Sequence, residues 1–579
     1  MNKVRLGLSQ INVLVGDIDG NLKKILKYIR IAKKSGVDIL CFPELSVTGY
    51  PPEDLLLKPS FIEDNLEALD EVRKATDSIT VVVGFADKNQ DIYNAAAIIH
   101  NKVLIDVYHK CYLPNYSVFD ENRYFQAGVR APVYQLGDLV FGVNICEDIW
   151  YPGDPIRKQA VLGDAQVILN ISSSPYYASK VQARERMLLT RASDYSVVIG
   201  YCNLVGGQDE LIFDGHSVVI DERGEVIARA SGFEEELLIA DVNVQRVFPS
   251  RLHDPRRRKE KYVIGLEDKD VNVLELAVGD LKRNSRPAIT PMVAEFMEYR
   301  EEVFKALVMG TRDYVTKNRF SNVVIGLSGG IDSSLVSAIA VEALGKENVV
   351  GVSMPSRYSS KGSTVDAERL SKNLGIELIT IPIEPAFSAY LEMFSGVFAG
   401  KGQDVTEENI QARIRGNILM ALSNKFGWLV LTTGNKSETS VGYSTLYGDM
   451  AGGFSVIKDV PKTLVYRLAE FYNGWKGKEI IPKSVISKPP SAELRPNQLD
   501  VDSLPSYDVL DPILKAYVEE DLSIEEIIAQ GFEEEMVNRI VRMVDLNEYK
   551  RRQSPPGIKI TPRAFGKDRR FPITNLFRE

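Results

Sequence analysis

The second half of this 579-residue chain contains no cysteine and no histidine. All such side chains lie within the first 253 residues: Cys41, Cys111, Cys146, Cys202, His100, His109, His216 and His253. A zinc site built from cysteine and histidine, a cysteine nucleophile and an imidazole base are therefore excluded from the second half. Its chemistry must rest on carboxylates, hydroxyls, lysine, arginine and metal ions.

Other missing features narrow the class of protein. No two cysteines form a CxxC pair, and no run of 18 apolar residues exists, so neither a disulfide framework nor a membrane span is expected. The chain enters an amphipathic strand directly after Met1, which is unlike a signal peptide. A net charge of −9 argues against a dedicated nucleic-acid binder. We therefore expect a cytoplasmic protein with no membrane or nucleic-acid partner.

The first 245 residues predict a layered α/β domain. Residues 4–9 alternate as a half-buried strand does, and residues 21–35 have the apolar spacing of a helix. Residues 221–224, Asp-Glu-Arg-Gly, predict a hairpin turn. Further strands in βα-type units are predicted at 37–42, 80–85, 94–99, 139–145, 167–171 and 196–202.

A strand, a small-residue turn and a helix follow one another around residue 330. The turn GLSGGIDSS (326–334) follows an apolar run, and its glycines allow the backbone to approach a ligand closely. The amides that open the next helix attract anions. Asp332 would repel a phosphate unless a cation lay between them, so it is a predicted Mg²⁺ ligand. The alternative is an ordinary glycine- and serine-rich turn.

Strands and helices alternate through the rest of the second half. A long helix is predicted at 293–318, and strands at 348–355, 377–382 and 428–434. This order predicts a doubly wound parallel sheet that binds ligands at its carboxyl edge, in a domain over residues 291–579. Residues 246–290 form a predicted connector, whose basic run at 256–259 we interpret as a solvated linker.

Three chemically active side chains lie at predicted strand ends in the first half. Glu44, Lys110 and Cys146 have simple individual interpretations as a surface acid, a loop lysine and a core cysteine. Together they supply what thiol-based amide hydrolysis needs. An ammonium lowers the pKa of a thiol, a carboxylate takes its proton, and the ammonium stabilises the oxyanion.

The segments around these residues resemble the nitrilase and amidase superfamily. They are FPELSVTGY (42–50), HKCYLP (109–114) and GVNICEDIW (142–150), and they follow one another in the order of that superfamily. The resemblance implies an αββα sandwich with a Glu44–Lys110–Cys146 triad. Glutamine-dependent members imply L-glutamine as the amide, in a pocket lined by Tyr116, Ser174 and Lys180. Glu147 could orient the ammonium of glutamine or only neighbour the site.

The second half resembles the ATP pyrophosphatases, and more closely the NAD synthetases. The SGGIDS loop carries the first resemblance and implies an adenine nucleotide alpha hydrolase-like domain. The second is carried by ENIQARIRG (408–416), TGNKSE (433–438) and YGD (447–449), and a tail at 549–557 resembles the glutamine-using form. This resemblance implies ATP and deamido-NAD⁺ as substrates.

The resemblance also implies site residues. For ATP they are Leu327, Ser328, Gly329, Gly330, Ile331, Asp332, Ser333, Ser334, Met354 and Thr433. For deamido-NAD⁺ they are Asn409, Arg413, Glu438, Lys462 and Lys550, and for Mg²⁺ they are Asp332 and Glu438. Three simpler alternatives remain open: core packing for Met354, a helix cap for Asn409 and a solvated tail for Lys550.

Taken together, the two resemblances predict a glutamine-dependent NAD⁺ synthetase. Ammonia released at Cys146 would replace AMP on an adenylated nicotinate carboxylate. The family implies a homo-oligomer with an internal passage for ammonia. One alternative is another amidotransferase on the same two modules, and another is a non-catalytic sensor of dinucleotide and glutamine. A tRNA-thiolating enzyme is disfavoured because the second half lacks cysteine.

Overall fold

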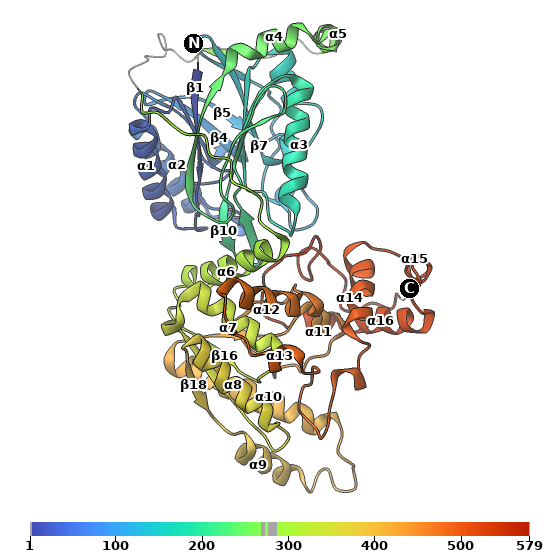
Figure 1. Cartoon of the computed structure of the whole chain (residues 1–579). Coiled ribbons are helices and arrows are strands. Elements are labelled where there is room, and N and C mark those ends of the chain that lie inside the picture. Colours follow the sequence, from blue (N-terminus) through green and yellow to red (C-terminus); the bar gives the residue numbers. More distant parts are fainter. Residues whose placement is uncertain (1–2, 268–272, 276–285, 578–579) are drawn as a thin grey trace. The chain divides into compact units, whose positions relative to one another are not determined.

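The computed structural model describes residues 3–267, 273–275 and 286–577. The chain divides into two compact units (Figure 1). The first unit comprises Met1–Gln208 and Ile212–Met297, and the second comprises Asp209–Leu211 and Glu298–Glu579. Within the described ranges, every helix is too short or too polar to cross a membrane.

The first unit contains two large β-sheets. The six-stranded sheet has the order β14-β1-β2-β3-β4-β5 and the seven-stranded sheet the order β13-β12-β9-β8-β7-β6-β15, beside a small β10–β11 pair. The strands are β1 (Lys3–Gln10), β2 (Ile39–Cys41), β3 (Thr80–Asn89), β4 (Asp91–His100), β5 (Val103–His109), β6 (Val133–Leu136), β7 (Leu139–Ile145), β8 (Val167–Ser172), β9 (Val198–Asn203), β10 (Val205–Gln208), β11 (Leu211–Asp214), β12 (Val218–Ile220), β13 (Val226–Arg229), β14 (Glu236–Asn243) and β15 (Val273–Glu275).

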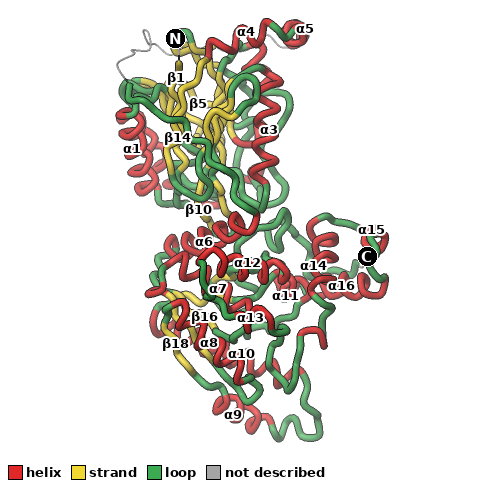
Figure 2. The backbone as a smooth tube through the Cα atoms, in the orientation of Figure 1, coloured by secondary structure: helices red, strands yellow, loops and turns green. Residues whose placement is uncertain are grey.

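The two sheets pack face to face between helices. Leu6 and Leu8 from one sheet share a buried core with Val143 and Leu169 from the other. Helices α1 (Ile18–Lys34) and α2 (Pro59–Ala75) cover the first sheet, and α3 (Lys180–Tyr195) covers the second (Figures 1 and 2). This layering confirms the predicted αββα sandwich.

Two predicted βα units in the six-stranded sheet, those of the strands at 80–85 and 94–99, are wrong. Strands β3, β4 and β5 form an antiparallel meander with no helix between them. Gln90 joins the first pair, and Asn101 and Lys102 join the second, all with positive φ angles. Two consecutive left-handed residues give the tight hairpin turn whose twist matches that of the strands. The predicted 221–224 turn between β12 and β13 is confirmed.

Part of the predicted connector is helical and attached to the first unit. It contains α4 (Val247–Leu252) and α5 (Pro255–Glu267). Arg257, from the basic run, donates hydrogen bonds to the Ala160 carbonyl and to Asp164. The interpretation of the basic run as wholly solvated is therefore wrong at Arg257. Residues 268–272 and 276–285 of the predicted connector lie outside the described residues.

The helix predicted from residue 293 begins only at Tyr299, the first residue of α6 (Tyr299–Lys317). The Arg229 amide donates to the Met292 carbonyl, and the Arg229 carbonyl accepts a hydrogen bond from the Ala294 amide. The chain is therefore extended at residues 292–294. This backbone pairing overrides the helical spacing of the sequence.

The second unit is built on a five-stranded parallel sheet of order β18-β17-β16-β19-β20, with helices α7 and α10 both packed on β16. It confirms the predicted doubly wound sheet. The strands are β16 (Val323–Gly326), β17 (Val349–Ser353), β18 (Glu377–Thr380), β19 (Leu429–Thr432) and β20 (Phe454–Ser455). The helices after α6 are α7 (Ile331–Leu344), α8 (Lys361–Leu374), α9 (Glu384–Phe394), α10 (Val405–Phe426), α11 (Lys436–Val441), α12 (Lys462–Lys476), α13 (Lys483–Ser487), α14 (Tyr507–Leu514), α15 (Ile524–Ala529), α16 (Glu534–Leu546) and α17 (Glu548–Arg551).

The 408–416 segment lies within helix α10. Helix α10 begins at Val405, and the side chain of Asp404 caps it by accepting the Thr406 amide. Asn409 therefore lies inside the helix, and its alternative interpretation as a helix cap is wrong.

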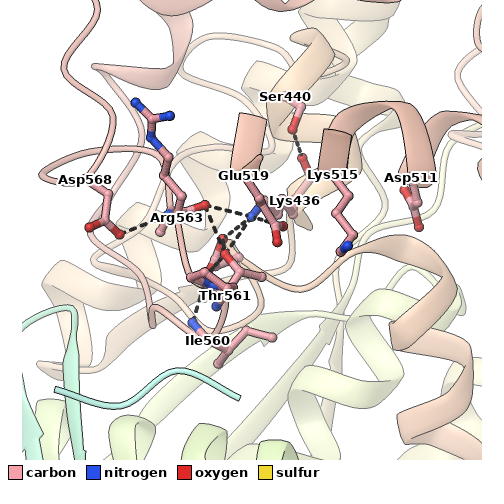
Figure 3. Close-up of polar contacts among 12 residues, drawn as sticks. Lys436, Ser440, Asp511, Lys515, Glu519, Ile560, Thr561, Arg563 and Asp568 are labelled. Atoms are coloured by element: carbon pink, nitrogen blue, oxygen red, sulfur yellow. Dashed lines mark hydrogen bonds and ion pairs between the residues drawn. The ribbon is translucent and has the colours of Figure 1, made fainter. Parts of the chain in front are cut away.

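A buried lysine fastens α11 to the C-terminal segment of the second unit (Figure 3). Lys436 is 2% exposed, and its Nζ lies 2.7 Å from Glu519 Oε1, 2.9 Å from Asp459 Oδ1 and 2.7 Å from Thr561 Oγ1. The Ile560 and Thr561 amides donate to Asp459 as well, at 2.8 and 2.7 Å. One ammonium thus compensates two buried carboxylates and joins three segments that are distant in the sequence.

We expect the Lys436→Met variant to lose about 3–5 kcal/mol of unfolding free energy, because Asp459 and Glu519 would remain buried without a cation. Urea unfolding monitored by circular dichroism measures the loss. The matched control is Lys515→Met, which removes an exposed lysine paired with Glu520 and should change stability by about 0.5 kcal/mol or less. Equal losses in the two variants would contradict the assigned role of Lys436.

Gly84 in β3 supports the backbone around Glu44. A Cβ at this position would lie 2.4 Å from both the Leu45 nitrogen and the Pro43 oxygen. We expect Gly84→Ala to displace that backbone and to destabilise the first unit by about 1–3 kcal/mol. Gly153→Ala is the control, because a Cβ at Gly153 meets no atom within 4 Å. Thermal unfolding should separate the two variants, and an unchanged midpoint for Gly84→Ala would refute the steric argument.

Candidate functional site

A buried ammonium between two carboxylates forms the centre of the first unit. Lys110 follows β5, and its Nζ lies 2.7 Å from Glu44 Oε1 and 2.9 Å from both carboxylate oxygens of Glu121. All three side chains are almost fully buried. Water is excluded from the trio, so each charge acts strongly on the others.

Burial and neighbouring charges act in opposite directions on the pKa values of Lys110 and Glu121. Burial by itself would lower the pKa of Lys110, but the negative charges of Glu121 and Glu44 raise it well above its usual value. Burial raises the pKa of Glu121, and Lys110 opposes that shift. Lys110 therefore stays charged, and the pKa of Glu121 is raised to about 7.

Cys146 lies at a strained turn directly after β7, with φ of 42°. Burial and the charge of Glu44 raise the pKa of its thiol, whereas the charge of Lys110 and a hydrogen bond with Ser172 lower it. The structure thus brings Glu44, Lys110 and Cys146 together. Strain at a buried nucleophile is typical of an active site.

Glu44 is held in place from two sides. The Asn94 amide group on β4 donates to Glu44 Oε1 at 2.7 Å, and the Ser173 backbone amide donates to Oε2 at 2.8 Å. The Ser173 hydroxyl also donates to the Glu44 carbonyl at 3.0 Å. These contacts fix the carboxylate that the sequence assigns as the general base.

The three predicted glutamine-pocket residues have different surroundings. Tyr116 is exposed, and its hydroxyl donates to Glu147 Oε1 at 2.8 Å. Ser174 is buried, and its backbone amide donates to Asn203 Oδ1 at 3.0 Å. Lys180 donates from Nζ to the Pro175 carbonyl at 2.6 Å. Glu147 therefore joins the neighbourhood of Cys146 to that of Tyr116.

Sequence reasoning missed Glu121 and Ser172. Glu121 lies in an irregular segment at the start of a 3₁₀ turn, and no local pattern marks it. A signal did exist for Ser172, because it ends a strand parallel to the one that precedes Cys146. The carboxyl ends of neighbouring parallel strands meet at one edge of a sheet.

A cavity of about 340 Å³ lies at the carboxyl edge of β16, β17 and β19 in the second unit. Most of the residues predicted for ATP line it, together with two of those predicted for deamido-NAD⁺. They are Leu327, Ser328, Gly330, Ile331, Asp332, Ser333, Met354, Thr433, Glu438 and Lys462. Met354, for which core packing was the alternative, also contacts the apolar cluster under the cavity.

The turn before α7 gives this cavity an anion-binding character. Gly329 has φ of +74°, and a Cβ there would lie 2.2 Å from the Ser363 carbonyl oxygen, so only glycine fits. Gly330 caps α7 without a side-chain hydrogen bond, which leaves the first helix amides available to a ligand. Ser334 supports the turn from behind by donating to the Gly330 carbonyl at 2.8 Å.

The carboxylates of Asp332 and Glu438 both contact the ammonium of Lys462 in the cavity. Lys462 Nζ donates to Asp332 and lies 3.2 Å from Glu438 Oε1, while the Asn435 amide group donates to Asp332 at 2.9 Å. Burial raises the pKa of Glu438, and the charge of Lys462 opposes this. The pair suits a divalent cation such as Mg²⁺, because carboxylate oxygens are the protein ligands that this ion prefers.

Three residues predicted for the dinucleotide are not among those that line this cavity. Asn409 accepts the Thr445 hydroxyl at 2.7 Å, and Arg413 is exposed with Nε donating to the Leu446 carbonyl at 3.2 Å. Lys550 Nζ donates to the Gly442 and Ser444 carbonyls at 2.7 and 3.0 Å.

The sequence reasoning also missed three cationic side chains that line the cavity, those of Arg415, Lys458 and Lys488. Arg415 lies two residues beyond Arg413 on α10, and its Nε donates to the Met354 carbonyl at 3.1 Å. Helical residues two apart do not share a face, which distinguishes the two arginines.

Comparison with known proteins agrees with this two-part geometry. Residues 5–251 match the carbon-nitrogen hydrolase family and residues 303–554 match the NAD synthase family. The chain is 52% identical to a glutamine-dependent NAD(+) synthetase of Thermotoga maritima, with all of both chains covered. It is 48% identical to that of Aquifex aeolicus, covering 99% of this chain and 100% of the relative.

A solved structure agrees as well. The glutamine-dependent NAD(+) synthetase of Acinetobacter baumannii, in complex with ADP, is 41% identical over 99% of this chain and 98% of its own, with a TM-score of 0.72. Full-length identity at this level, together with the family matches over both halves of the chain, shows that the chain belongs to the glutamine-dependent NAD⁺ synthetase family.

Proposed function

We propose that this chain converts deamido-NAD⁺ to NAD⁺ with ammonia released from L-glutamine, and that ATP is cleaved to AMP and pyrophosphate. One observation carries the proposal. A buried Glu44–Lys110 pair beside a strained cysteine occurs in the same chain as an anion-binding turn with a converging acid pair. The first arrangement suits amide cleavage, and the second suits carboxylate activation by ATP.

In the first step, glutamine is hydrolysed in a domain over residues 1–245. The Cys146 thiol gives its proton to Glu44, and Sγ attacks the amide carbonyl carbon. The Lys110 ammonium stabilises the oxyanion. As the tetrahedral species collapses, its nitrogen takes the proton from Glu44 and leaves as ammonia, and a thioester remains. Glu44 then deprotonates a water molecule that releases glutamate and restores the thiol. Glutamine is oriented by Tyr116, Ser174 and Lys180.

In the second step, ATP activates the nicotinate carboxylate in a domain over residues 291–579. Residues 327–334, Met354 and Thr433 hold ATP. The carboxylate attacks the α-phosphorus and pyrophosphate leaves, and ammonia then displaces AMP from the acyl adenylate. Asn409, Arg413, Glu438, Lys462 and Lys550 bind the dinucleotide.

Asp332 and Glu438 would hold Mg²⁺, which supplies charge neutralisation for the phosphates when bound. Their convergence on one lysine is the feature that fits such an ion. Thr433 and the turn serines position the remaining phosphate oxygens, so that the reacting atoms are aligned.

The proposal also covers the connection of the two domains and the setting in which the enzyme acts. Residues 246–290 connect the two domains, and the enzyme acts in the cytoplasm as a homo-oligomer without membrane or nucleic-acid partners. Ammonia passes through the protein, because in neutral water it would be protonated and lose its nucleophilic electron pair.

Substitution of the nucleophile should uncouple the two steps. Cys146→Ala should abolish NAD⁺ formation from glutamine and retain formation from added ammonium chloride. Product analysis with amide-¹⁵N glutamine, ATP and deamido-NAD⁺ provides the measurement, since label should reach the nicotinamide only in the wild type. The control is Cys111→Ala, which changes a half-buried cysteine with no role in the proposed reaction. It should keep both routes.

Loss of both routes in Cys146→Ala would contradict the two-site mechanism. Loss of neither would remove Cys146 from the glutaminase reaction, and no synthesis by either route in the wild type would favour a sensor. Calorimetry with deamido-NAD⁺ tests the other alternative, because an amidotransferase for a different carboxylate should not bind it.

Substitution of the acid pair should affect both nitrogen sources equally. We expect Glu438→Gln to lower synthesis from glutamine and from ammonia by about 10²-fold or more, and to raise the Mg²⁺ concentration for half-maximal rate. Glu384→Gln, which changes an exposed acid paired with Arg357, is the matched control. A variant of Glu438 with unchanged Mg²⁺ dependence would remove this residue from the proposed metal site.

A further inference from the structure

Two hydroxyl groups lie behind the Cys146 thiol in the first unit. Ser172 ends the strand next to the one that leads to Cys146, its side chain lowers the pKa of the thiol, and the Tyr201 hydroxyl donates to Ser172 Oγ at 2.8 Å. Ser172 and Tyr201 are fully buried, and Cys146 is 3% exposed. Neither hydroxyl has a part in the reaction proposed above.

The parallel strands of the seven-stranded sheet determine this arrangement. Ile145 of β7 is in register with Ile171 of β8, so Cys146 and Ser172 leave the sheet at the same edge. Asn170 of β8 is in register with Tyr201 of β9, two residues before the level of Ser172. A tyrosine is long enough to reach the end of the neighbouring strand, which places its hydroxyl on Ser172.

The direction of the hydrogen bonds matters for the charge on sulfur. A hydroxyl group carries one hydrogen and can accept at the same time. Tyr201 donates to Ser172, so Ser172 keeps its own hydrogen for Cys146. When the thiol has lost its proton, only this orientation remains available, because a thiolate accepts and does not donate. A hydrogen bond to a charged acceptor is stronger than one to a neutral acceptor.

Tyr201 is itself held by a buried ion pair. The Arg184 guanidinium lies 5.7 Å from the centre of the Tyr201 ring and donates to both carboxylate oxygens of Asp214, at 3.0 and 2.8 Å. The Asn203 side chain donates to the same carboxylate at 3.4 Å. All of these side chains are buried, so the ring of Tyr201 has little freedom to turn.

We propose that Ser172 and Tyr201 are positioning residues that orient a hydrogen-bond donor toward the sulfur of Cys146 and thereby stabilise its thiolate. This inference rests on the proposed role of Cys146 as the glutaminase nucleophile. It adds a donor that acts from the sheet edge, separate from the ammonium of Lys110.

The need for a second donor follows from the surroundings of the thiol. Burial and the neighbouring Glu44 both disfavour a thiolate, and the Lys110 ammonium is shared between Glu44 and Glu121. Its charge is therefore partly compensated before it acts on sulfur. Ser172 has no charge of its own to be compensated, and accepting from Tyr201 leaves its hydrogen available for the sulfur.

The test follows the reactivity of Cys146 with iodoacetamide as a function of pH, in the full-length chain, by peptide mass spectrometry. We expect Ser172→Ala to shift the midpoint of alkylation upward by about one pH unit, as loss of one hydrogen bond to a charged group predicts. The kcat of glutamine hydrolysis should fall about tenfold while KM for glutamine stays close to that of the wild type. A change in KM alone would contradict the inference.

Further variants separate positioning from packing. Tyr201→Phe keeps the ring and removes the donor to Ser172, so it should shift the midpoint in the same direction by a smaller amount. Ser172→Thr keeps a hydroxyl and should restore the wild-type midpoint. Tyr134→Phe is the matched control, because Tyr134 is an equally buried tyrosine that donates to Asp106, and it should leave the midpoint unchanged. If Ser172→Ala does not fold, Tyr201→Phe compared with Tyr134→Phe decides the question.

Unchanged midpoints in both Ser172→Ala and Tyr201→Phe would overturn the inference. That result is distinguishable from failure of the proposed function, which would instead appear as glutamine-driven synthesis that persists in Cys146→Ala.

Discussion

The interaction on which the first unit depends is the pairing of one buried ammonium with two buried carboxylates. Lys110 without Glu44 and Glu121 would be a costly buried charge, and the two acids without Lys110 would repel each other. Because each group needs the others, their positions are fixed together. The chemistry assigned to Glu44 and Lys110 is a consequence of this mutual constraint, since a base and an oxyanion partner must both be held before substrate arrives.

In both units, parallel strands bring the side chains of the site together at one edge of a sheet. β7, β8 and β9 bring Cys146, Ser172 and Tyr201 to one sheet edge, and β16, β17 and β19 bring the anion-binding turn, Met354 and Thr433 to another. In each case the reactive groups come from segments that are distant in sequence. The sheet supplies rigidity, and the loops beyond it supply the chemistry.

Sequence patterns predicted those parts of the structure that depend on local information. Glu44, Lys110 and Cys146 each end a recognisable strand within a short motif, and the turn at 326–334 carries its own glycine spacing. Glu121 escaped because its role comes only from the distant partner Lys110. The start of α6 was misplaced because pairing with Arg229 extends residues 292–294. Arg413 and Arg415 share a motif, and only helix geometry places Arg415 at the cavity.

The contact of Lys462 with Asp332 and Glu438 has a consequence for how the second unit responds to its ligands. The lysine serves as an internal counter-ion and compensates part of the negative charge of the acid pair. If the two acids hold the proposed divalent cation, that cation would compete with this ammonium, and the displaced lysine would be free to contact phosphate oxygens. In the proposed function, metal binding and the release of the lysine toward the phosphates would then be one exchange.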